Sequence, residues 1–313
     1  MPTRPILELR AGLRKRLRSL FDARGFVEVD TPVLSSEVLP EAHIDPLTVH
    51  LAGLGSAPHY LQASPEAHMK RLLAEGSGPI YQFARSFRAG ERAARHDIEF
   101  VLLEWYAPGK TLDEMAELLD ALCAATLDTT GLERLTCRAA FGPLAGIDPL
   151  AATLEEWRAA GARAGLALPE GHPDSCDAWF ELLLAEVVSP RLGHGRPTML
   201  EAWPPAQAAF GRLDDASPPT ARRFELFAAG VELANGWEEE TRREILLERI
   251  AAANALRIRD GRSALPVPAR FVEAHGPAMP AGVGAALGFD RLAMLAAGAA
   301  SIDVVRCFTS RTA

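Results

Sequence analysis

A concentration of arginines marks the first stretch of the sequence whose residue types could do chemistry. Four arginines lie within 85–95, and His96 follows them directly. Guanidinium groups form paired hydrogen bonds with phosphate oxygens, so this cluster suits a polyphosphate ligand. The simpler alternative is a solvated turn, because acidic residues alternate with the arginines. Composition alone leaves both interpretations open.

Two carboxylates form the second candidate site. Glu225 and Glu232 are seven positions apart, with a predicted hairpin turn at Ala229–Gly230 between them. On neighbouring strands the two side chains could face each other and hold a hard dication such as Mg²⁺, which phosphates would share. The alternative is that both acids lie on the solvated face of an ordinary hairpin.

A glycine-rich run before Arg291 is the third candidate. Residues 282–288 contain glycine at positions 282, 284 and 288, which allows a ligand to approach the backbone closely. The spacing fits neither a dinucleotide fingerprint nor a Walker A loop. An arginine at a helix start opposes the helix dipole, so Arg291 needs an anion nearby. A phosphate would serve, and so would a carboxylate such as Asp290.

The elements that must position these residues follow from apolar spacing, caps and breakers. Helices are predicted over 5–23, 64–75, 174–188, 241–259 and 290–297, and behind capping boxes at Thr111 and Thr153. Thr241, with Glu244 three positions later, is predicted to cap the helix over 241–259. Strands are predicted over 26–29, 80–87, 98–105, 198–203, 223–229, 231–235 and 282–288. The adjacent strand pairs are hairpins, and helices separate two groups of strands. The pattern predicts one α+β domain over 1–313 with a helical insertion at about 111–195.

Composition limits the class of protein. The 313 residues are 48% hydrophobic and 24% charged, which is typical of a globular chain. The net charge of −8 disfavours broad nonspecific nucleic-acid binding. The four cysteines are scattered and predict neither a zinc site nor a disulfide framework. No stretch is long and apolar enough for a membrane span, and the charged start at 1–4 has no signal core, so we expect a cytoplasmic protein.

Taken in order, these segments resemble the signature motifs of class II aminoacyl-tRNA synthetases. Motif 1 is similar to 25–34, motif 2 to 87–100 and motif 3 to 284–291. Within that class the chain resembles lysyl-tRNA synthetases, through 64–66, 70–72, 103–106 and 232–236. The resemblance covers essentially the whole chain. It implies a class II synthetase catalytic domain, an antiparallel β-sheet flanked by helices.

One branch of this family fits best. Motif 1 begins about two dozen residues into the chain, so we expect no anticodon-binding domain ahead of it. The sequence is therefore similar to the truncated paralogues of lysyl-tRNA synthetase, the elongation factor P (R)-β-lysine ligases. Ser64 stands where lysyl-tRNA synthetases usually have alanine, and Ala286 where they have glycine. A minimal enzyme that charges tRNA and a non-catalytic regulatory subunit remain the alternatives.

The resemblance implies a reaction and roles for named residues. ATP and Mg²⁺ are expected, with (R)-β-lysine or lysine activated as an adenylate and passed to a lysine ε-amine of elongation factor P. The catalytic residues implied are Arg88, which bridges carboxylate and α-phosphate, Arg291, which holds the distal phosphates, and the metal ligands Glu225 and Glu232. The residues implied for ATP binding are Arg88, Ala89, Gly90, Asp97, Phe100, Glu232, Leu233, Gly288 and Arg291. Those implied for the amino acid are Ser64, Pro65, Glu66, Tyr106, Asn235, Trp237, Glu239 and Ala286.

Some positions depart from the family pattern. Asp97 stands where motif 2 usually has asparagine, and Trp237 replaces a phenylalanine but keeps an aromatic wall. Ala286 adds a methyl group that we expect to favour the β-amino isomer, since one methyl changes discrimination by roughly 1–3 kcal/mol. A homodimer is expected because motif 1 forms the dimer contact in this class. Neither a tRNA nor a membrane is expected as a partner.

Overall fold

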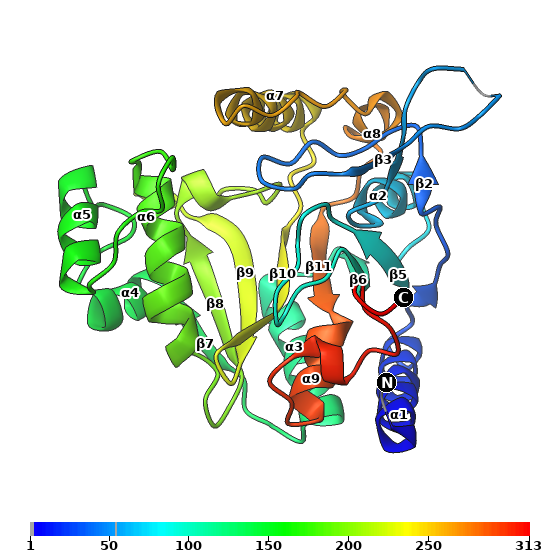
Figure 1. Ribbon diagram of the computed structural model, residues 1–313, viewed down its shortest axis with the longest axis horizontal. Helices are drawn as coiled ribbons and strands as arrows, with labels where there is room; N and C mark the ends of the chain where they lie inside the picture. The colour runs from blue at the N-terminus through cyan, green and yellow to red at the C-terminus, as the bar shows by residue number, and fades with distance from the viewer. Residues whose placement is uncertain (1–2, 54) are drawn as a thin grey trace. The chain divides into compact units, whose positions relative to one another are not determined.

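The computed structural model describes residues 3–53 and 55–313. The chain divides into two compact units, which we describe separately (Figure 1). The first contains Met1–Thr111, Ala125–Leu127 and Glu239–Ala313. The second contains Leu112–Ala124 and Asp128–Glu238. The prediction of a single domain with an insertion at about 111–195 stays a prediction.

The first unit is built on an antiparallel hairpin with a strand on either side. Its strands follow the order β1-β5-β6-β11, with β1 parallel to β5 and the other pairs antiparallel. A small second sheet has the order β2-β4-β3. The strands are β1 (Val27–Glu28), β2 (Leu34–Ser35), β3 (Leu47–Val49), β4 (His59–Leu61), β5 (Ile80–Phe87), β6 (Glu99–Pro108) and β11 (Gly282–Gly288). The helices are α1 (Arg4–Asp22), α2 (Glu66–Ala74), α7 (Arg243–Arg259), α8 (Ala269–Ala274) and α9 (Phe289–Ala296), with a 3₁₀ turn at Ile302–Val304.

Helix α1 packs on this hairpin because its apolar residues recur at helical spacing. Leu13, Leu17 and Phe21 are fully buried along one face. The Phe21 ring stacks on Tyr81 of β5, with 4.9 Å between ring centroids, and lies 5.3 Å from the Trp105 ring of β6. These aromatic contacts hold β5 and β6 in place, and the loop between these two strands carries the arginine cluster.

The second unit has helices on a mixed sheet of its own. Its strands follow the order β10-β9-β8-β7, with β7 parallel to β8 and the others antiparallel. The strands are β7 (Glu133–Thr136), β8 (Thr198–Trp203), β9 (Ala221–Ala228) and β10 (Val231–Glu238). The helices are α4 (Cys137–Ala145), α5 (Leu154–Arg163) and α6 (Cys176–Leu183), with short turns at Leu184–Val188, Ser189–Arg191 and Pro205–Gln207. Helix α3 (Leu112–Leu127) contributes residues to both units.

Aromatic side chains fill the core beneath these helices. Phe141, Trp157, Phe180 and Trp203 are each at most 2% exposed and belong to one cluster. The Phe141 and Phe180 rings are stacked, with 4.9 Å between their centroids. Large aromatic groups bury much apolar area per residue, so this cluster stabilises the helices that cover β8 and β9.

The predicted α+β class is confirmed, although the sheet is mixed rather than wholly antiparallel. The hairpin turn is at Ala229–Gly230, where both residues adopt positive φ, and Asn235 lies inside β10. Two local predictions were wrong. Thr241 does not cap α7, whose N-cap is Arg242 without a side-chain cap. The predicted helix over 174–188 is α-helical only to Leu183 and then widens into a π-turn before Pro190, which has no backbone N–H.

Candidate active site

The start of helix α2 supplies the first part of the site. The Ser64 hydroxyl accepts a hydrogen bond from the Glu66 amide at 2.9 Å, so it satisfies a free N–H at the helix start. The same hydroxyl donates to Oε2 of Glu104 at 2.8 Å. Pro65 is the N-cap. Ser64 therefore binds the first amide of the helix and also contacts a carboxylate on β6.

A buried lysine joins two of the predicted amine-binding acids. The Lys70 Nζ lies 2.6 Å from Oε1 of Glu66 and 2.6 Å from Oε2 of Glu239. The Lys70 side chain is 1% exposed, and the two carboxylates are at most 9% exposed. Burial by itself would lower the pKa of the Lys70 ammonium, but the charges of Glu239 and Glu66 outweigh it and raise that pKa.

Glu104 is an acid of the site that the sequence analysis missed. Its side chain accepts hydrogen bonds from the Tyr106 hydroxyl at 2.6 Å and from Ser64. Burial, together with the charge of Glu66, raises the pKa of Glu104 to about 8. The signal was present in the sequence as a single acid within the apolar run 100–108, since buried carboxylates are rare without a partner.

Strand pairing sets two predicted positions beside this acid. Ala286 of β11 is the cross-strand partner of Glu104, and Gly284 is the partner of Tyr106. Cross-strand partners project from the same face of a sheet, so the Ala286 methyl group lies next to the Glu104 side chain. A Cβ atom on Gly284 would lie 2.4 Å from Tyr106 Cε1 and 2.6 Å from Glu239 Oε1. The absence of a side chain at Gly284 therefore makes room for the Tyr106 ring and the Glu239 carboxylate.

The arginine-rich loop brings Arg88 and Phe100 together. The Arg88 guanidinium lies over the Phe100 ring, 5.1 Å from its centroid, and 3.8 Å from Glu91. Its backbone N–H donates to Ile98, and the Ala89 N–H donates to the Asp45 carbonyl. Gly90 has a positive φ of 78°, which suits glycine at this turn. A cation and an aromatic face at one place are what phosphate and adenine recognition require.

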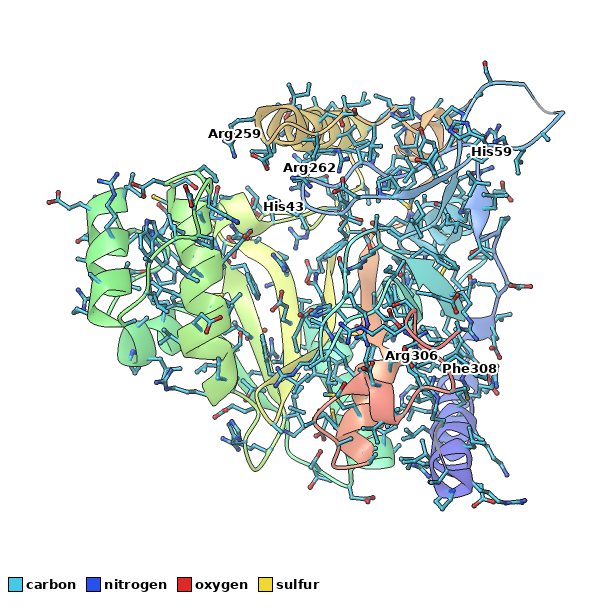
Figure 2. The ribbon with its side chains drawn as sticks, viewed as in Figure 1. His43, His59, Arg259, Arg262, Arg306 and Phe308 are labelled. Atoms are coloured by element: carbon cyan, nitrogen blue, oxygen red, sulfur yellow. The ribbon has the colours of Figure 1, made fainter. Side chains whose placement is uncertain are left out.

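Helix α7 is hydrogen-bonded to the segment 41–45, which contacts the arginine-rich loop through the Ala89–Asp45 backbone bond. Arg257 is 3% exposed, and its guanidinium donates to the Glu41 and Ile44 carbonyls and to the Asp45 carboxylate. Arg262, which follows α7 and is labelled in Figure 2, has its guanidinium 3.9 Å from the Asp45 carboxylate. Burial raises the pKa of Glu41 to about 7, and the charge of Arg88 opposes that rise.

Arg291 lies in the first turn of α9 and reaches back to the same loop. Its Nε donates to the Arg95 carbonyl at 3.3 Å, and one terminal nitrogen is 2.5 Å from Nε2 of His96. Asp290 is engaged elsewhere, by Arg10 at 2.7 Å and by the Val101 amide at 3.1 Å. Gly288 is the N-cap of α9. The loop and the helix start thus place two guanidinium groups, Arg88 and Arg291, in one unit.

Asp97 braces the C-terminal segment. Its buried carboxylate accepts hydrogen bonds from Arg306 at 2.6 Å and from the Ser310 amide at 3.0 Å, and Figure 2 shows Arg306 on that segment. Burial alone would raise the pKa of Asp97, but the Ser310 and Ile98 hydrogen bonds and the Arg306 charge lower it. The contact between Asp97 and adenine stays a prediction.

The second unit carries the remaining predicted residues on one hairpin. Asn235 is the cross-strand partner of Glu225, and Glu232 is the partner of Phe227. Residues 225 and 227 project from the same face, so Glu225, Glu232 and Asn235 do so too. Leu233 is buried, and the Trp237 ring lies 6.4 Å from the Phe210 ring.

The sequence analysis did not anticipate Arg223 as a partner of this set. Arg223 donates to Glu225 at 2.6 Å and to the Asn235 side-chain oxygen at 3.1 Å. Its guanidinium also stacks 4.1 Å from the Trp203 ring centroid. Within residues 3–53 and 55–313, no three His, Cys, Asp or Glu side chains are grouped for a metal ion. A two-carboxylate pair on one face does fit Mg²⁺ that takes its other ligands from phosphates and water.

Comparison with known proteins identifies the family. The family model for class II tRNA synthetases (D, K and N) matches residues 2–312. The chain belongs to this class II synthetase family. It is 36% identical over 308 residues to the elongation factor P--(R)-beta-lysine ligase of Enterobacter sp. (strain 638), which covers 97% of this chain and 95% of the relative.

Other relatives of this class II synthetase carry the same name. The ligase of Edwardsiella ictaluri (strain 93-146) is 36% identical, with 98% of this chain and 96% of the relative covered. That of Vibrio cholerae is 36% identical, with 98% and 97% covered. The resemblance inferred from the motifs is therefore confirmed by comparison along nearly the full length.

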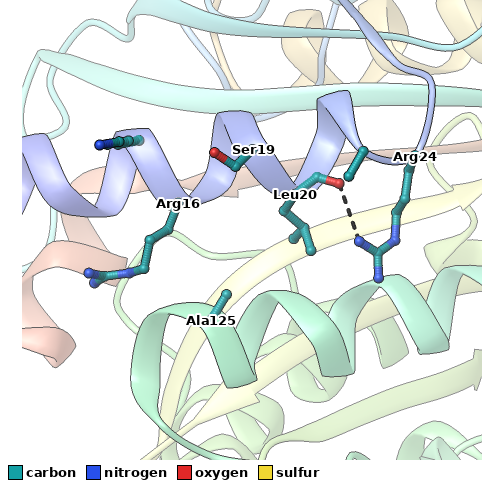
Figure 3. Close-up of a pocket in the computed structure, with 7 residues that line it drawn as sticks. Arg16, Ser19, Leu20, Arg24 and Ala125 are labelled. Atoms are coloured by element: carbon teal, nitrogen blue, oxygen red, sulfur yellow. Dashed lines mark hydrogen bonds between the residues drawn. The ribbon is translucent and has the colours of Figure 1, made fainter.

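A pocket of about 420 Å³ lies elsewhere on the class II synthetase, along helix α1 (Figure 3). It is lined by Lys15, Arg16, Ser19, Leu20, Ala23, Arg24 and Ala125. Arg24 donates to the Leu20 carbonyl across one side of it. None of the predicted site residues lines this pocket. Among the helices of the described residues, none has the length and apolar character of a membrane span.

Proposed function

We propose that this class II synthetase activates (R)-β-lysine, or lysine, with ATP and transfers it to a lysine ε-amine of elongation factor P. The observation that carries the proposal is the buried acidic cluster of Glu66, Glu104 and Glu239. Burying carboxylates is costly unless cations pair with them, and Lys70 accounts for only one cation. A substrate with two ammonium groups supplies the rest. The relatives' names point to the same amino acid and acceptor.

In the first step, a substrate carboxylate oxygen attacks the α-phosphorus of ATP. A new P–O bond forms, the bond to the β-phosphate breaks, and pyrophosphate leaves. Two anions must meet, so charge screening is the main catalytic demand, and no base is required. Arg88 neutralises the carboxylate and the α-phosphate, Arg291 binds the distal phosphates, and Phe100 stacks on adenine. Glu225 and Glu232 would hold Mg²⁺, which would neutralise phosphate charge when bound.

The amino acid is oriented by its amines. Glu239 and Tyr106 bind the distal ammonium, Glu66 and Ser64 lie at the other amine, and Asn235 orients the carboxylate. Glu104 is well placed to join them, because its two oxygens already meet the Ser64 and Tyr106 hydroxyls. The Ala286 methyl group beside Glu104 narrows the space for an α-amine, which favours the β-isomer.

In the second step, the acceptor lysine nitrogen attacks the adenylate carbonyl carbon. The lysine ammonium first loses a proton to become the nucleophilic amine. An amide bond then forms, the bond to AMP breaks, and the nitrogen gives up a second proton to solvent or to the departing phosphate. We propose that the enzyme works as a homodimer in the cytoplasm, where a translation factor acts. Arginines near residue 90 then guide an acidic acceptor by charge.

ATP–pyrophosphate exchange tests this proposal. We expect exchange to depend on (R)-β-lysine, with lysine a poorer substrate, and Ala286→Gly to shift the preference toward lysine. Mass analysis should then find elongation factor P heavier by one β-lysyl group, with no aminoacylation of tRNA in a parallel assay. If the purified protein shows no exchange with either isomer, the proposal that it is an enzyme is refuted. Charging of tRNA without modification of the factor would instead favour a minimal lysyl-tRNA synthetase.

A further inference from the structure

Lys70 is unusual among the lysines of this chain because its charged side chain is buried. The chain has three lysines, Lys15, Lys70 and Lys110, among 33 basic residues. Lys15 is exposed on helix α1, whereas the Lys70 side chain is 1% exposed. A compact ammonium fits between two closely spaced carboxylates, whereas the planar guanidinium of arginine is larger and has fixed donor directions. The choice of lysine at this one buried position is therefore a geometric requirement.

The two carboxylates that Lys70 joins come from separate parts of the first unit. Glu66 is in the first turn of α2, one helical turn before Lys70. Glu239 follows β10 in sequence, and its amide donates to the Gly282 carbonyl at 2.9 Å. Each carboxylate lies 2.6 Å from the same nitrogen, so their oxygens are held at a set separation. The Lys70 ammonium also lies 5.7 Å from the centroid of the Tyr106 ring.

The charges of the three carboxylates and Lys70 sum to a value that matches a diamino acid. Glu104 holds a proton near neutral pH in the free pocket, and a bound substrate ammonium would displace that proton. Glu66, Glu104 and Glu239 then carry three negative charges, and Lys70 removes one. Two negative charges remain, which equals the charge of the two ammonium groups on a diamino acid. Without Lys70 the cluster would hold an excess carboxylate charge that no substrate group neutralises, and such a charge is costly in a dry pocket.

We propose that Lys70 is a positioning residue that sets the spacing of Glu66 and Glu239 and leaves the pocket with charge for two substrate amines. The inference rests on the proposed function, because it assigns Lys70 a part in recognising the diamino acid. Lys70 does not contact the reacting atoms. It acts through the two carboxylates that bind the amines.

The test compares Lys70→Met with Lys15→Met, which makes the same change at the exposed lysine. ATP–pyrophosphate exchange is measured from pH 6 to 9. The (R)-β-lysine concentration is varied at saturating ATP, and the ATP concentration is then varied at saturating (R)-β-lysine. For Lys70→Met we expect the KM for (R)-β-lysine to rise roughly tenfold or more, since two buried ion pairs that orient the site are lost. The KM for ATP should stay within about twofold, as should both constants in Lys15→Met.

The pH profile separates positioning from a purely structural role. Two neighbouring carboxylates with no cation between them share a proton to higher pH, so the acid limb of kcat/KM should move upward in Lys70→Met. The titratable groups around Lys70 are Glu66 on α2, Glu104 and Tyr106 on β6, Glu239, and His275 after α8. Burial, with the charge of Lys70, lowers the pKa of His275 to about 4, so His275 stays neutral throughout this range in the wild type.

Each outcome decides the inference. An unchanged KM for (R)-β-lysine in folded Lys70→Met overturns it, and so does an equal rise in both KM values with an unmoved acid limb. If Lys70→Met does not fold, Lys70→Arg is decisive. It keeps the charge but alters the spacing, so we expect a raised KM with an unshifted acid limb, and an unchanged KM overturns the inference. Absence of exchange in the wild type would instead refute the proposed function.

Discussion

Replacing Gly284 by alanine perturbs the amine pocket through one methyl group. The added Cβ would lie 2.4 Å and 2.5 Å from two Tyr106 ring carbons and 2.6 Å from Glu239 Oε1. Non-bonded carbons prefer a separation of roughly 3.5–4.0 Å, so the Tyr106 ring must move by about 1 Å. The φ angle of Gly284 is not in the left-handed region, so the effect is steric and not conformational.

The magnitude follows from the hydrogen bond that this movement breaks. The Tyr106 hydroxyl lies 2.6 Å from Glu104, and a shift of about 1 Å takes it beyond hydrogen-bond range. In the substrate complex we expect a bound ammonium to keep Glu104 ionised. A hydrogen bond to a charged group contributes about 1.5–3 kcal/mol, which corresponds to a roughly 10- to 150-fold loss in kcat/KM for the amino acid. The KM for ATP should change little, because Arg88 and Phe100 lie on the neighbouring hairpin loop.

The assay is ATP–pyrophosphate exchange with the two substrates varied in turn. Gly12→Ala is the matched control, because its new Cβ meets nothing closer than 3.6 Å, at a flexible arginine tip on the α1 surface. Thermal unfolding of both variants checks that the fold is retained. A folded Gly284→Ala enzyme with unaltered kcat/KM for (R)-β-lysine would refute the steric reasoning.

Further predictions concern pH and stability. Because Glu104 has a pKa near 8 in the folded protein and an ordinary carboxyl value of 4.5 when unfolded, the folded state holds the extra proton, and stability falls as pH rises between these values. Glu104→Gln should flatten this fall in chemical denaturation, and should also reduce (R)-β-lysine-dependent exchange. Gly161→Ala should lower the free energy of unfolding by about 1–3 kcal/mol, because its Cβ would lie 2.1 Å from the Trp179 ring, whereas thermal melts unchanged from wild type would contradict that packing. Arg306→Met should lower the free energy of unfolding by about 1.5–3 kcal/mol, because the buried Asp97 carboxylate loses a charged hydrogen-bond donor while it keeps Arg92 at 3.7 Å and the Ser310 amide, and the change should speed proteolysis of the C-terminal segment. Equal proteolysis rates in Arg306→Met and the wild type would contradict the role of the Arg306–Asp97 pair in holding the C-terminal segment.

Local features of the fold were predictable from the sequence because their causes are local. Helix α1 follows from the spacing of Leu13 and Leu17, and the capping box at Thr153 is present with both of its hydrogen bonds. Strands β8 and β11 have the predicted bounds. Thr241 failed as a cap because a matching residue pair does not decide which residue leaves helical geometry first, and Arg242 holds that position.

Some predicted site residues lie close together in the structure, while their roles in the reaction stay predictions. Arg88 with Phe100, and Glu225 with Asn235, lie together as the motifs imply. Glu104 and Arg223 escaped prediction because their importance lies in their partners. Ser64 meets Glu104 across 40 positions of sequence, and Arg223 meets Asn235 across the hairpin.

The sequence by itself determined the order of elements, the family and the residue types at the site, since these depend on neighbours along the chain. Only the tertiary structure decided which charges are buried and which groups neutralise them. Lys70 between Glu66 and Glu239, and Arg306 against Asp97 across 209 positions, are examples. The reason is physical. The energy of a charge depends on its solvent exposure and on partners within a few ångströms, and both are set when distant segments pack together.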